Sequence, residues 1–297
     1  MIKNFDDLIE QVKCKEKKKI VVAAAEDIEV LEVVEEVTKL GLADFILVGE
    51  KAKIEKIARD YNKIITCEII DEADNKKAAE KAVELLVNGQ ASVIMKGLLH
   101  TGTFLKAILN KEKGINTGNL ITQISVLEKE NGEGLQMLSD CAMAIQPNLN
   151  EKKQIIENAI RLALRLGYDK PRVALLSALE VVNPDIQDTL DAAILSKMGD
   201  RGQIKNAIID GPFALDNAIS PEAAAIKGIT GEVAGKADIL IAPNLQVGNV
   251  LHKALTYYAH KDVAAAVIGA GAPIVMTSRT DSVRTKVLSI ALSSYIS

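Results

Sequence analysis

The stretch that decides the fold runs from Lys19 to Val48 and reads KIVVAAAEDIEVLEVVEEVTKLGLADFILV. Lys19–Ala25 is an apolar run typical of a buried strand, and Phe45–Val48 is a second one. Between them, Asp27–Leu40 has the pattern of an amphipathic helix, with acidic residues at its start and Gly41 after its end. A strand, a helix and a strand in this order predict a parallel sheet that helices cover on both faces.

The same alternation continues along most of the chain. The pattern predicts further strands over residues 64–70, 92–95, 172–177, 207–210, 237–242 and 264–269, and helices over 73–87, 150–166, 185–197, 245–260 and 282–297. Between residues 120 and 145, strands follow one another directly through the polar segment Glu128–Gly134, which predicts an antiparallel hairpin. We therefore expect an α/β protein with two domains, residues 1–128 with 278–297 and residues 129–277. The last helix is expected to pack on the first domain.

Composition narrows the class of protein. The chain has 36 basic and 40 acidic residues and a net charge of −4, which argues against a general polyanion binder. Aromatic residues make up 3%, too few for the stacking platforms that hold single-stranded nucleic acid. The N-terminus lacks the apolar core of a secretory signal, and the apolar run 263–276 is too short and too broken for a membrane helix. Three widely spaced cysteines without a CxxC pair fit reduced thiols, so we expect a cytoplasmic protein without nucleic-acid or membrane partners.

One segment near the C-terminus predicts an anion site. In Pro273–Ser282, which reads PIVMTSRTDS, an apolar strand runs into Ser278 and Arg279, and a helix is expected to begin just after them. A helix start presents free backbone N–H groups, and arginine adds a planar fork of donors. Both features suit a phosphate or a carboxylate.

Polar residues also follow the strand predicted at 92–95. Lys96 and Gly97 come first, and the lysine could neutralise a phosphate. The residues that could hydrogen-bond a ligand follow them: His100, Thr101, Gly102 and Thr103. The alternative is an ordinary loop in which Thr101 or Thr103 caps the next helix.

Three further strand ends carry polar residues. Asp210 and Gly211 end the strand at 207–210, and Asp216 lies six residues after Asp210. The two carboxylates could ligate a divalent cation, although oxygen sites usually use more ligands, and ordinary turn chemistry is the alternative. Ser177 and Asn249 follow two other strands. Because ligands of open α/β sheets bind at the carboxyl ends of strands, these loops are the predicted substrate site.

Other patterns favour structural roles. The segment 268–273 lacks the third glycine of a dinucleotide loop and fits a tight turn between two strands. His252 and His260 are eight residues apart, which does not match a metal-binding pair, so we expect them at a surface or interface. Cys141 is expected to be a buried structural thiol, and no metal site is predicted.

Taken together, these loops resemble the phosphate acetyltransferase/phosphate butyryltransferase family. The matching segments are Lys96–Gly102, Ser139–Pro147, Leu176–Pro184, Asp210–Asp216, Ala237–Asn249 and Pro273–Arg279. The resemblance spans nearly the whole chain. The segment Ser177–Pro184, which reads SALEVVNP, is similar to the butyryl branch.

The resemblance implies two α/β domains of the isocitrate-dehydrogenase-like type, with mostly parallel sheets and the active site in the interdomain cleft. It implies reversible transfer of a short acyl group, with butyryl favoured, between coenzyme A and inorganic phosphate. Coenzyme A is then a substrate, no cofactor is tightly bound, and the protein is expected to form a homo-oligomer.

One departure from the family concerns the base. In the acetyltransferases, the serine of the Ser-Arg pair is followed seven residues later by an aspartate that acts on the coenzyme A thiol, and this chain has Thr285 there. Asp281 and Asp216 are the alternative proton acceptors. We expect Arg279 to bind phosphate and Ser278 to stabilise the oxyanion, with direct attack of phosphate on the thioester.

Two alternative functions stay open from the sequence. A metal-dependent NAD(P) oxidative decarboxylase of the same fold would need clustered carboxylates and a nicotinamide site. A non-catalytic binder of acyl-CoA or phosphate would retain the loops and lack the chemistry, as Thr285 could indicate.

Overall fold

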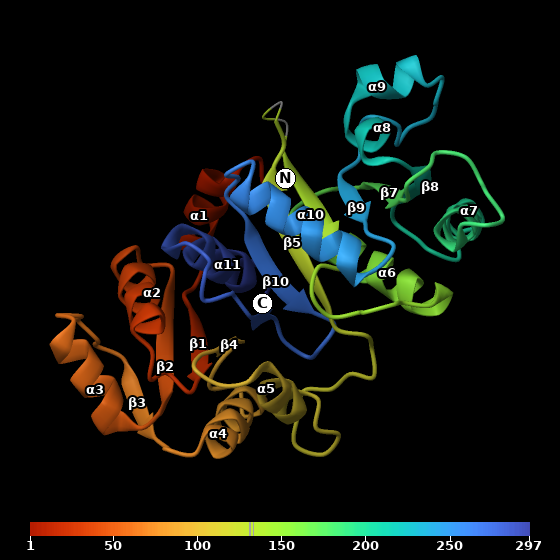
Figure 1. Cartoon of the computed structure of the whole chain (residues 1–297). Helices are drawn as coiled ribbons and strands as arrows, with labels where there is room; N and C mark the ends of the chain where they lie inside the picture. Colours follow the sequence, from red (N-terminus) through yellow and green to blue (C-terminus); the bar gives the residue numbers. More distant parts are fainter. Residues whose placement is uncertain (131, 133) are drawn as a thin grey trace. The chain divides into compact units, whose positions relative to one another are not determined.

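The computed structural model describes residues 1–130, 132 and 134–297 (Figure 1). The chain forms two compact units, which we call the N-terminal unit (Phe5–Ile121 with Val263–Ser297) and the central unit (Met1–Asn4 with Thr122–Asp262). Each unit has a sheet with helices packed on it, so the α/β class is confirmed. The predicted domain limits at residues 128 and 278 differ from the limits of these units, and the expected cleft stays a prediction.

The sheet of the N-terminal unit has the order β3-β2-β1-β4-β11-β10. Its strands are β1 (Lys18–Ala23), β2 (Ala43–Gly49), β3 (Glu68–Asp71), β4 (Val93–Lys96), β10 (Ala264–Ile268) and β11 (Ile274–Val275). The pairs from β3 to β11 are parallel, and β10 is antiparallel to β11. The tight turn expected between the last two strands is therefore confirmed.

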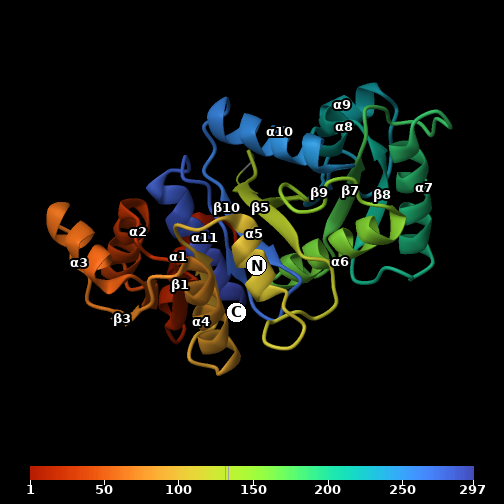
Figure 2. The same ribbon diagram turned by 60° about the horizontal axis from the view of Figure 1, so that its bottom comes forward.

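Six helices belong to this unit: α1 (Phe5–Lys13), α2 (Ile28–Lys39), α3 (Lys51–Asp60), α4 (Asn75–Val87), α5 (Thr101–Ile108) and α11 (Val283–Ile296). Helix α2 begins where predicted because Asp27 caps it, accepting the Glu29 N–H at 2.9 Å. Helix α11 packs on α1, α2 and β10, so the last helix lies where we expected it. Helices α4 and α5 lie side by side (Figure 2).

The sheet of the central unit has the order β5-β6-β9-β7-β8. Its strands are β5 (Thr122–Glu128), β6 (Leu135–Ser139), β7 (Arg172–Leu176), β8 (Ile208–Phe213) and β9 (Ile239–Ile241). Strands β5 and β6 form the predicted antiparallel hairpin, and the other pairs are parallel. Residues 131 and 133 of the predicted turn lie outside the described residues.

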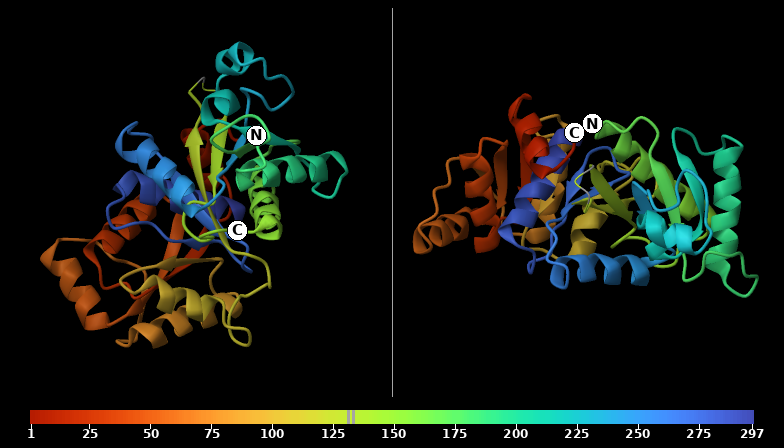
Figure 3. Two further views of the ribbon diagram at one scale, coloured as in Figure 1. Left: turned by 45° about the vertical axis from the view of Figure 1, so that its right-hand side comes forward. Right: turned by 90° about the horizontal axis from the view of Figure 1, so that it is seen from above.

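The helices of the central unit are α6 (Leu149–Arg165), α7 (Gln187–Asp200), α8 (Leu215–Ile219), α9 (Pro221–Ile226) and α10 (Leu245–Tyr257). Helix α10 lies on one side of the strands and α6 on the other (Figure 2). The short helices α8 and α9 contact each other (Figure 3, cyan). Several predicted limits differ from the observed ones: α7 begins at Gln187 and not at residue 185, β8 continues past residue 210 to Phe213, and α10 ends at Tyr257 and not at residue 260.

Within residues 1–130, 132 and 134–297, no helix combines the length and the apolar character that crossing a bilayer requires.

Candidate functional site

The carboxyl ends of three neighbouring strands build a hollow in the N-terminal unit. In the register of the sheet, Ala23 of β1 pairs with Lys96 of β4, and Met95 pairs with Val275 of β11. The loops that leave these strands therefore meet at one edge. We call this depression the Arg279 hollow, and it is lined by Asp27, Glu29, Val30, Met95, Lys96, Gly97, Thr277, Ser278, Arg279 and Lys286.

Gly97 lets the loop after β4 approach the end of β1. Its N–H donates to the Ala23 carbonyl at 2.9 Å, and a Cβ built on Gly97 would lie 2.1 Å from the Ala24 carbonyl oxygen. A larger residue would push the two loops apart. Gly97 therefore fixes the place of Lys96 beside the β1 loop.

Lys96 and Arg279 bring two positive charges to the hollow. Lys96 is half-buried, and its Nζ donates to the Gly97 carbonyl at 3.3 Å. Among the described residues, neither Lys96 nor Arg279 forms an ion pair with a carboxylate. Burial and the like charge of Arg279 lower the pKa of Lys96, and Asp27 opposes this only in part. Two cations that repel each other in this way favour the binding of an anion.

Glu29 and Lys286 also line the hollow, and the sequence did not point to either of them. Lys286 is buried, and its Nζ lies 2.6 Å from a Glu29 carboxylate oxygen and 3.5 Å from the Arg279 carbonyl. The two side chains are 257 positions apart in the sequence, so only the fold pairs them. The only sequence signal is a lysine among the otherwise apolar or small residues of the buried part of α11.

The segment that carries Arg279 is a turn, and α11 begins after it at Val283 with Ser282 as its N-cap, within one residue of the predicted start. The Asp281 carboxylate accepts the Ser278 N–H at 2.7 Å, and the Asp281 N–H donates to the Ser278 carbonyl at 3.1 Å. The Ser278 N–H thus has a partner within the turn. Asp281 closes the turn and does not line the hollow.

Thr285 lies one turn into α11. Ser282 caps this helix by accepting the Thr285 N–H at 3.1 Å, and the two hydroxyls are 3.1 Å apart. Thr285 is buried and cannot ionise in the relevant range. No proton acceptor therefore stands at the position of the family's aspartate.

The residues His100–Thr103 form the start of α5. His100 occupies the N-cap position without a side-chain cap, and its carbonyl accepts the Phe104 N–H at 3.1 Å. The alternative prediction, that Thr101 or Thr103 caps this helix, was wrong. The side chains of His100 and Thr101 are exposed, and the first turn directs N–H groups away from the helix.

The central unit holds the remaining predicted residues: Ser177 follows β7, Asp210 and Gly211 lie within β8, and Asn249 and Asp216 lie in helices. The Ser177 N–H donates to the Phe213 carbonyl at 2.8 Å, while its buried hydroxyl has no partner in the described part of the chain. Asp210 accepts the Gly211 N–H at 2.8 Å, and burial raises the pKa of its carboxyl group. An unpaired buried hydroxyl in this place is a candidate contact for a ligand.

The Asp216 side chain is exposed, and its carboxylate forms an ion pair, so it is not free to act as a base. Its carboxylate lies 3.1 Å from Lys227 Nζ, and this contact lowers the pKa of Asp216. Lys227 also lies 3.4 Å from Glu180, a residue of the SALEVVNP segment. The pairing connects α8 and α9 to the loop after β7.

Asn249 and the segment Ser139–Cys141 form a structural contact. The Asn249 amide donates to the Cys141 carbonyl at 3.1 Å. The Asp140 carboxylate accepts four backbone N–H groups, from Gln123, Ala142, Met143 and Ala144. Cys141 is buried as predicted, and burial raises the pKa of its thiol to about 12.

The expectation for His252 was wrong, because its side chain is buried. Its Nδ1 lies 3.0 Å from the Ser125 hydroxyl of β5. The reason is the period of the helix: residues 248 and 252 are four apart, so they lie on the same, buried face of α10. His260 is exposed, as expected.

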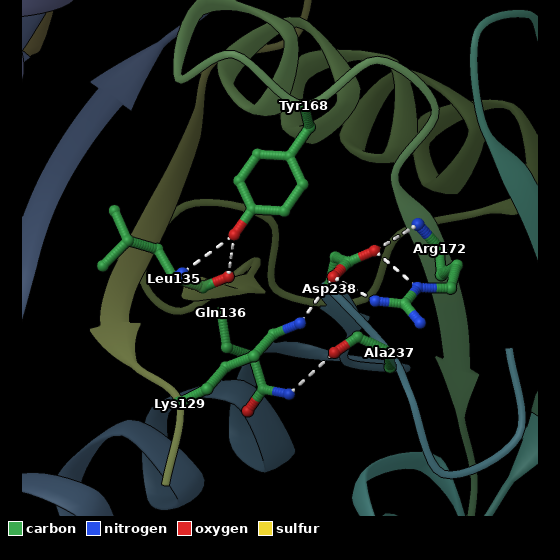
Figure 4. Close-up of polar contacts among 7 residues, drawn as sticks. All are labelled: Lys129, Leu135, Gln136, Tyr168, Arg172, Ala237 and Asp238. Atoms are coloured by element: carbon green, nitrogen blue, oxygen red, sulfur yellow. Dashed lines mark hydrogen bonds and ion pairs between the residues drawn. The ribbon is translucent and has the colours of Figure 1, made fainter. Parts of the chain in front are cut away.

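A second polar cluster lies at the amino ends of β7 and β9 (Figure 4). The buried Asp238 carboxylate lies 2.5 Å from Lys129 Nζ and 2.9 Å from the Arg172 guanidinium. Burial alone would raise the pKa of Asp238, but Arg172 and Lys129 outweigh it, and the pKa lies below its usual value. We call this group the Asp238 cluster.

No group of three His, Cys, Asp or Glu side chains suited to a metal ion occurs in residues 1–130, 132 and 134–297.

Comparison with known proteins assigns the chain to a family. The family model described as "Phosphate acetyl/butaryl transferase" matches residues 4–80 and 58–294. Phosphate butyryltransferase of Clostridium acetobutylicum is 49% identical, with 100% of this chain and 99% of that protein covered. Phosphate butyryltransferase of Clostridium beijerinckii is 48% identical, with 100% and 98% covered.

A solved structure agrees with these relatives. The branched-chain phosphotransacylase from Enterococcus faecalis superposes with a TM-score of 0.84 at 31% identity, covering 94% of this chain and 98% of that one. Similarity of sequence and of structure thus extends over nearly all residues, including the loops of the Arg279 hollow. The chain belongs to the phosphate acetyl/butyryl transferase family and is a transferase enzyme.

Proposed function

We propose that this enzyme transfers a short-chain acyl group, with butyryl favoured, between coenzyme A and inorganic phosphate. The names of its full-length relatives support the substrates. The single observation that supports the site is the pair Lys96 and Arg279, two cations that share one hollow without a carboxylate partner among the described residues. A phosphate dianion would relieve this repulsion.

Arg279 is proposed to hold the phosphate. Its guanidinium is a permanent charge with a planar fork of donors, and its side chain is exposed at the hollow. Lys286 contacts the Arg279 carbonyl and pairs with Glu29, so it would keep the Arg279 backbone in place. The exposed start of α5 at His100–Thr103 offers further N–H groups to an anionic substrate.

Ser278 is proposed to stabilise the oxyanion through its hydroxyl. The Ser278 N–H is held by Asp281, which makes Asp281 a residue that positions the turn. The Ser278 hydroxyl lies 2.9 Å from that of Thr280 and can turn toward a substrate oxygen. Gly97, Ser177, Asp210, Gly211 and Asn249 are proposed to shape the rest of the substrate site, with Asp216 holding Lys227.

The acyl group is proposed to pass directly from sulfur to phosphate in a ternary complex. Cys141, which lies in the matching segment Ser139–Pro147, is a poor nucleophile because it is fully buried and its pKa is about 12. No covalent acyl-enzyme is then needed. Mass spectrometry of enzyme quenched during turnover should show no acylated peptide, and finding one would overturn direct attack.

Thiol release from a series of acyl-CoAs, with and without phosphate, tests the function. We expect release only with phosphate, fastest for butyryl-CoA. Arsenate in place of phosphate should drain the thioester, because acyl arsenates hydrolyse. A non-catalytic binder would leave the thioester intact in both assays, and activity lost on EDTA treatment would favour the metal-dependent alternative.

We also propose that the enzyme is cytoplasmic and self-associates, binding no cofactor tightly. An apolar stripe supports association: Val247, Val250 and Tyr258 are exposed along α10 and at its end. Light scattering coupled to size exclusion would measure the mass, and a monomer at micromolar concentration would contradict the proposal.

A further inference from the structure

We propose that Lys96 is the general acid that protonates the coenzyme A thiolate as it leaves, and the base that takes the thiol proton in the reverse reaction. This inference rests on the proposed function, because it needs an acyl-CoA and a phosphate at the Arg279 hollow. Lys96 would then carry out the proton transfer that Thr285, which stands in place of the acetyltransferases' aspartate, cannot perform.

The carboxylates near the site are all engaged. Asp281 accepts the Ser278 N–H at 2.7 Å, and Glu29 lies 2.6 Å from Lys286 Nζ. Asp27 caps α2 by accepting the Glu29 N–H at 2.9 Å. Each of these three carboxylates is thus already engaged in a contact that holds the turn, the ion pair or the helix start in place.

Asp216, the other proposed base, has the same difficulty. Lys227 lies 3.1 Å from its carboxylate and lowers its pKa. A carboxyl group with a depressed pKa is too weak a base for a thiol, whose ordinary pKa is about 8.5. None of these four acids therefore suits the proton transfer.

Lys96 has the freedom that these groups lack. Lys96 lines the hollow together with Ser278 and Arg279, and the one hydrogen bond of its Nζ in the described part of the chain goes to the Gly97 carbonyl at 3.3 Å. The charged groups around it are Asp27 and Glu29 of the α2 start, Arg279 of the turn and Lys286 of α11. Burial and Arg279 lower its pKa from the usual value for lysine, which brings it closer to that of a thiol.

The proton balance closes with these groups alone. An oxygen of hydrogen phosphate attacks the acyl carbon, the carbon–sulfur bond breaks, and sulfur keeps the electron pair. The Lys96 ammonium gives its proton to sulfur and becomes a neutral amine. The acyl phosphate that forms releases the proton of the original hydrogen phosphate, and this proton restores the ammonium. In reverse, the neutral amine accepts the thiol proton.

Lys96→Arg separates proton transfer from charge, because arginine keeps the positive charge and does not release a proton below about pH 12. We expect kcat for butyryl-CoA and phosphate to fall about 100-fold or more, while KM for phosphate changes less than about threefold. Lys106→Arg, the same change at an exposed lysine of α5, should match wild type. Wild-type kcat should also fall at alkaline pH as Lys96 loses its proton.

The outcomes separate the alternatives. An unchanged kcat in Lys96→Arg would overturn the inference, because Lys96 would then contribute only its positive charge. A raised KM for phosphate at wild-type kcat would overturn it as well. If the arginine variant does not fold, Lys96→Ala with added methylamine replaces it: recovery of kcat that depends on the amine's pKa supports the inference, and no recovery rejects it. If wild type itself releases no thiol with phosphate, the proposed function fails and the inference falls with it, whereas an active wild type with an unchanged Lys96→Arg variant overturns the inference alone.

Discussion

The two charged clusters of this protein differ in how their charges are balanced. In the Asp238 cluster, one buried carboxylate lies between Lys129 and Arg172, and the pKa of the acid is lowered (Figure 4). In the Arg279 hollow, Lys96 and Arg279 face the same space, and the pKa of the lysine is lowered because its charge is disfavoured. We expect the first cluster to stabilise the fold, whereas the second holds charge that the fold alone does not need.

The positions of the clusters agree with this difference. Arg172 is the first residue of β7, and Asp238 precedes β9, so the paired cluster lies at amino ends of strands. Lys96 and Ser278 lie at or just after the carboxyl ends of β4 and β11. Ligands of parallel sheets bind at carboxyl ends, so the unbalanced charges lie where a substrate can reach them.

Removal of Arg279 should give the largest effect. Arg279→Ala is expected to lower kcat/KM about 100- to 1000-fold, because water cannot replace a fixed cation at the reacting centre. The free energy of unfolding should hardly change, since the side chain is exposed. Steady-state kinetics with butyryl-CoA and urea unfolding measure both. Arg284→Ala, which removes an exposed arginine at the start of α11, is the control. If Arg279→Ala retained activity within a few-fold of wild type, Arg279 would not be the anion ligand.

Breaking the Asp238 cluster should have the opposite signature. Asp238→Asn is expected to lower the free energy of unfolding by about 3 kcal/mol, because Lys129 and Arg172 lose their common partner. kcat of the folded enzyme should stay near wild type. Urea unfolding checks the first value, with the exposed Asp169→Asn as control. An unchanged urea midpoint together with a lowered kcat would mean that the Asp238 cluster serves catalysis and not stability.

The pH dependence of stability sharpens the same contrast. The pKa of Asp238 is lower in the folded protein than the value of about 3.9 in an unfolded chain, so its contribution is complete above about pH 4. That contribution declines as the pH falls toward the folded pKa. Urea unfolding of wild type and Asp238→Asn at pH 6 and pH 3 should therefore show a smaller difference at pH 3. An equal difference at both values would mean that Asp238 keeps its ordinary pKa.

The smallest expected effect is a gain in stability. Lys96→Met should raise the free energy of unfolding by about 0.5–1 kcal/mol, because it removes a half-buried charge that Arg279 repels. The same variant should lose acyl transfer. Thermal unfolding beside Lys106→Met, at an exposed site, measures the gain. A loss of stability would show that the Lys96 ammonium is balanced in the folded protein.

The sequence predicted most elements of the sheet well, and helix limits and side-chain burial less well. The strand-helix-strand pattern from Lys19 to Val48 appears as β1, α2 and β2, because apolar runs and the Asp27 cap act locally. The start of α7 was predicted at residue 185 and lies at Gln187, because local patterns define helix ends only to within a residue or two. The burial of His252 was missed because spacing between histidines says nothing about which face of α10 meets the sheet.

By itself, the sequence determined that the chain is α/β, where most helices and strands lie, and that Lys96, Ser278 and Arg279 follow strand ends. These features depend on local propensity and periodicity, which a short segment carries on its own. Only the tertiary structure decided that Lys96 and Arg279 share one hollow, that Lys286 pairs with Glu29, and that Asp281 takes the Ser278 N–H. Such contacts depend on strand order and register, which bring together residues from distant parts of the chain. The charges of these side chains affect one another only after folding has brought them close.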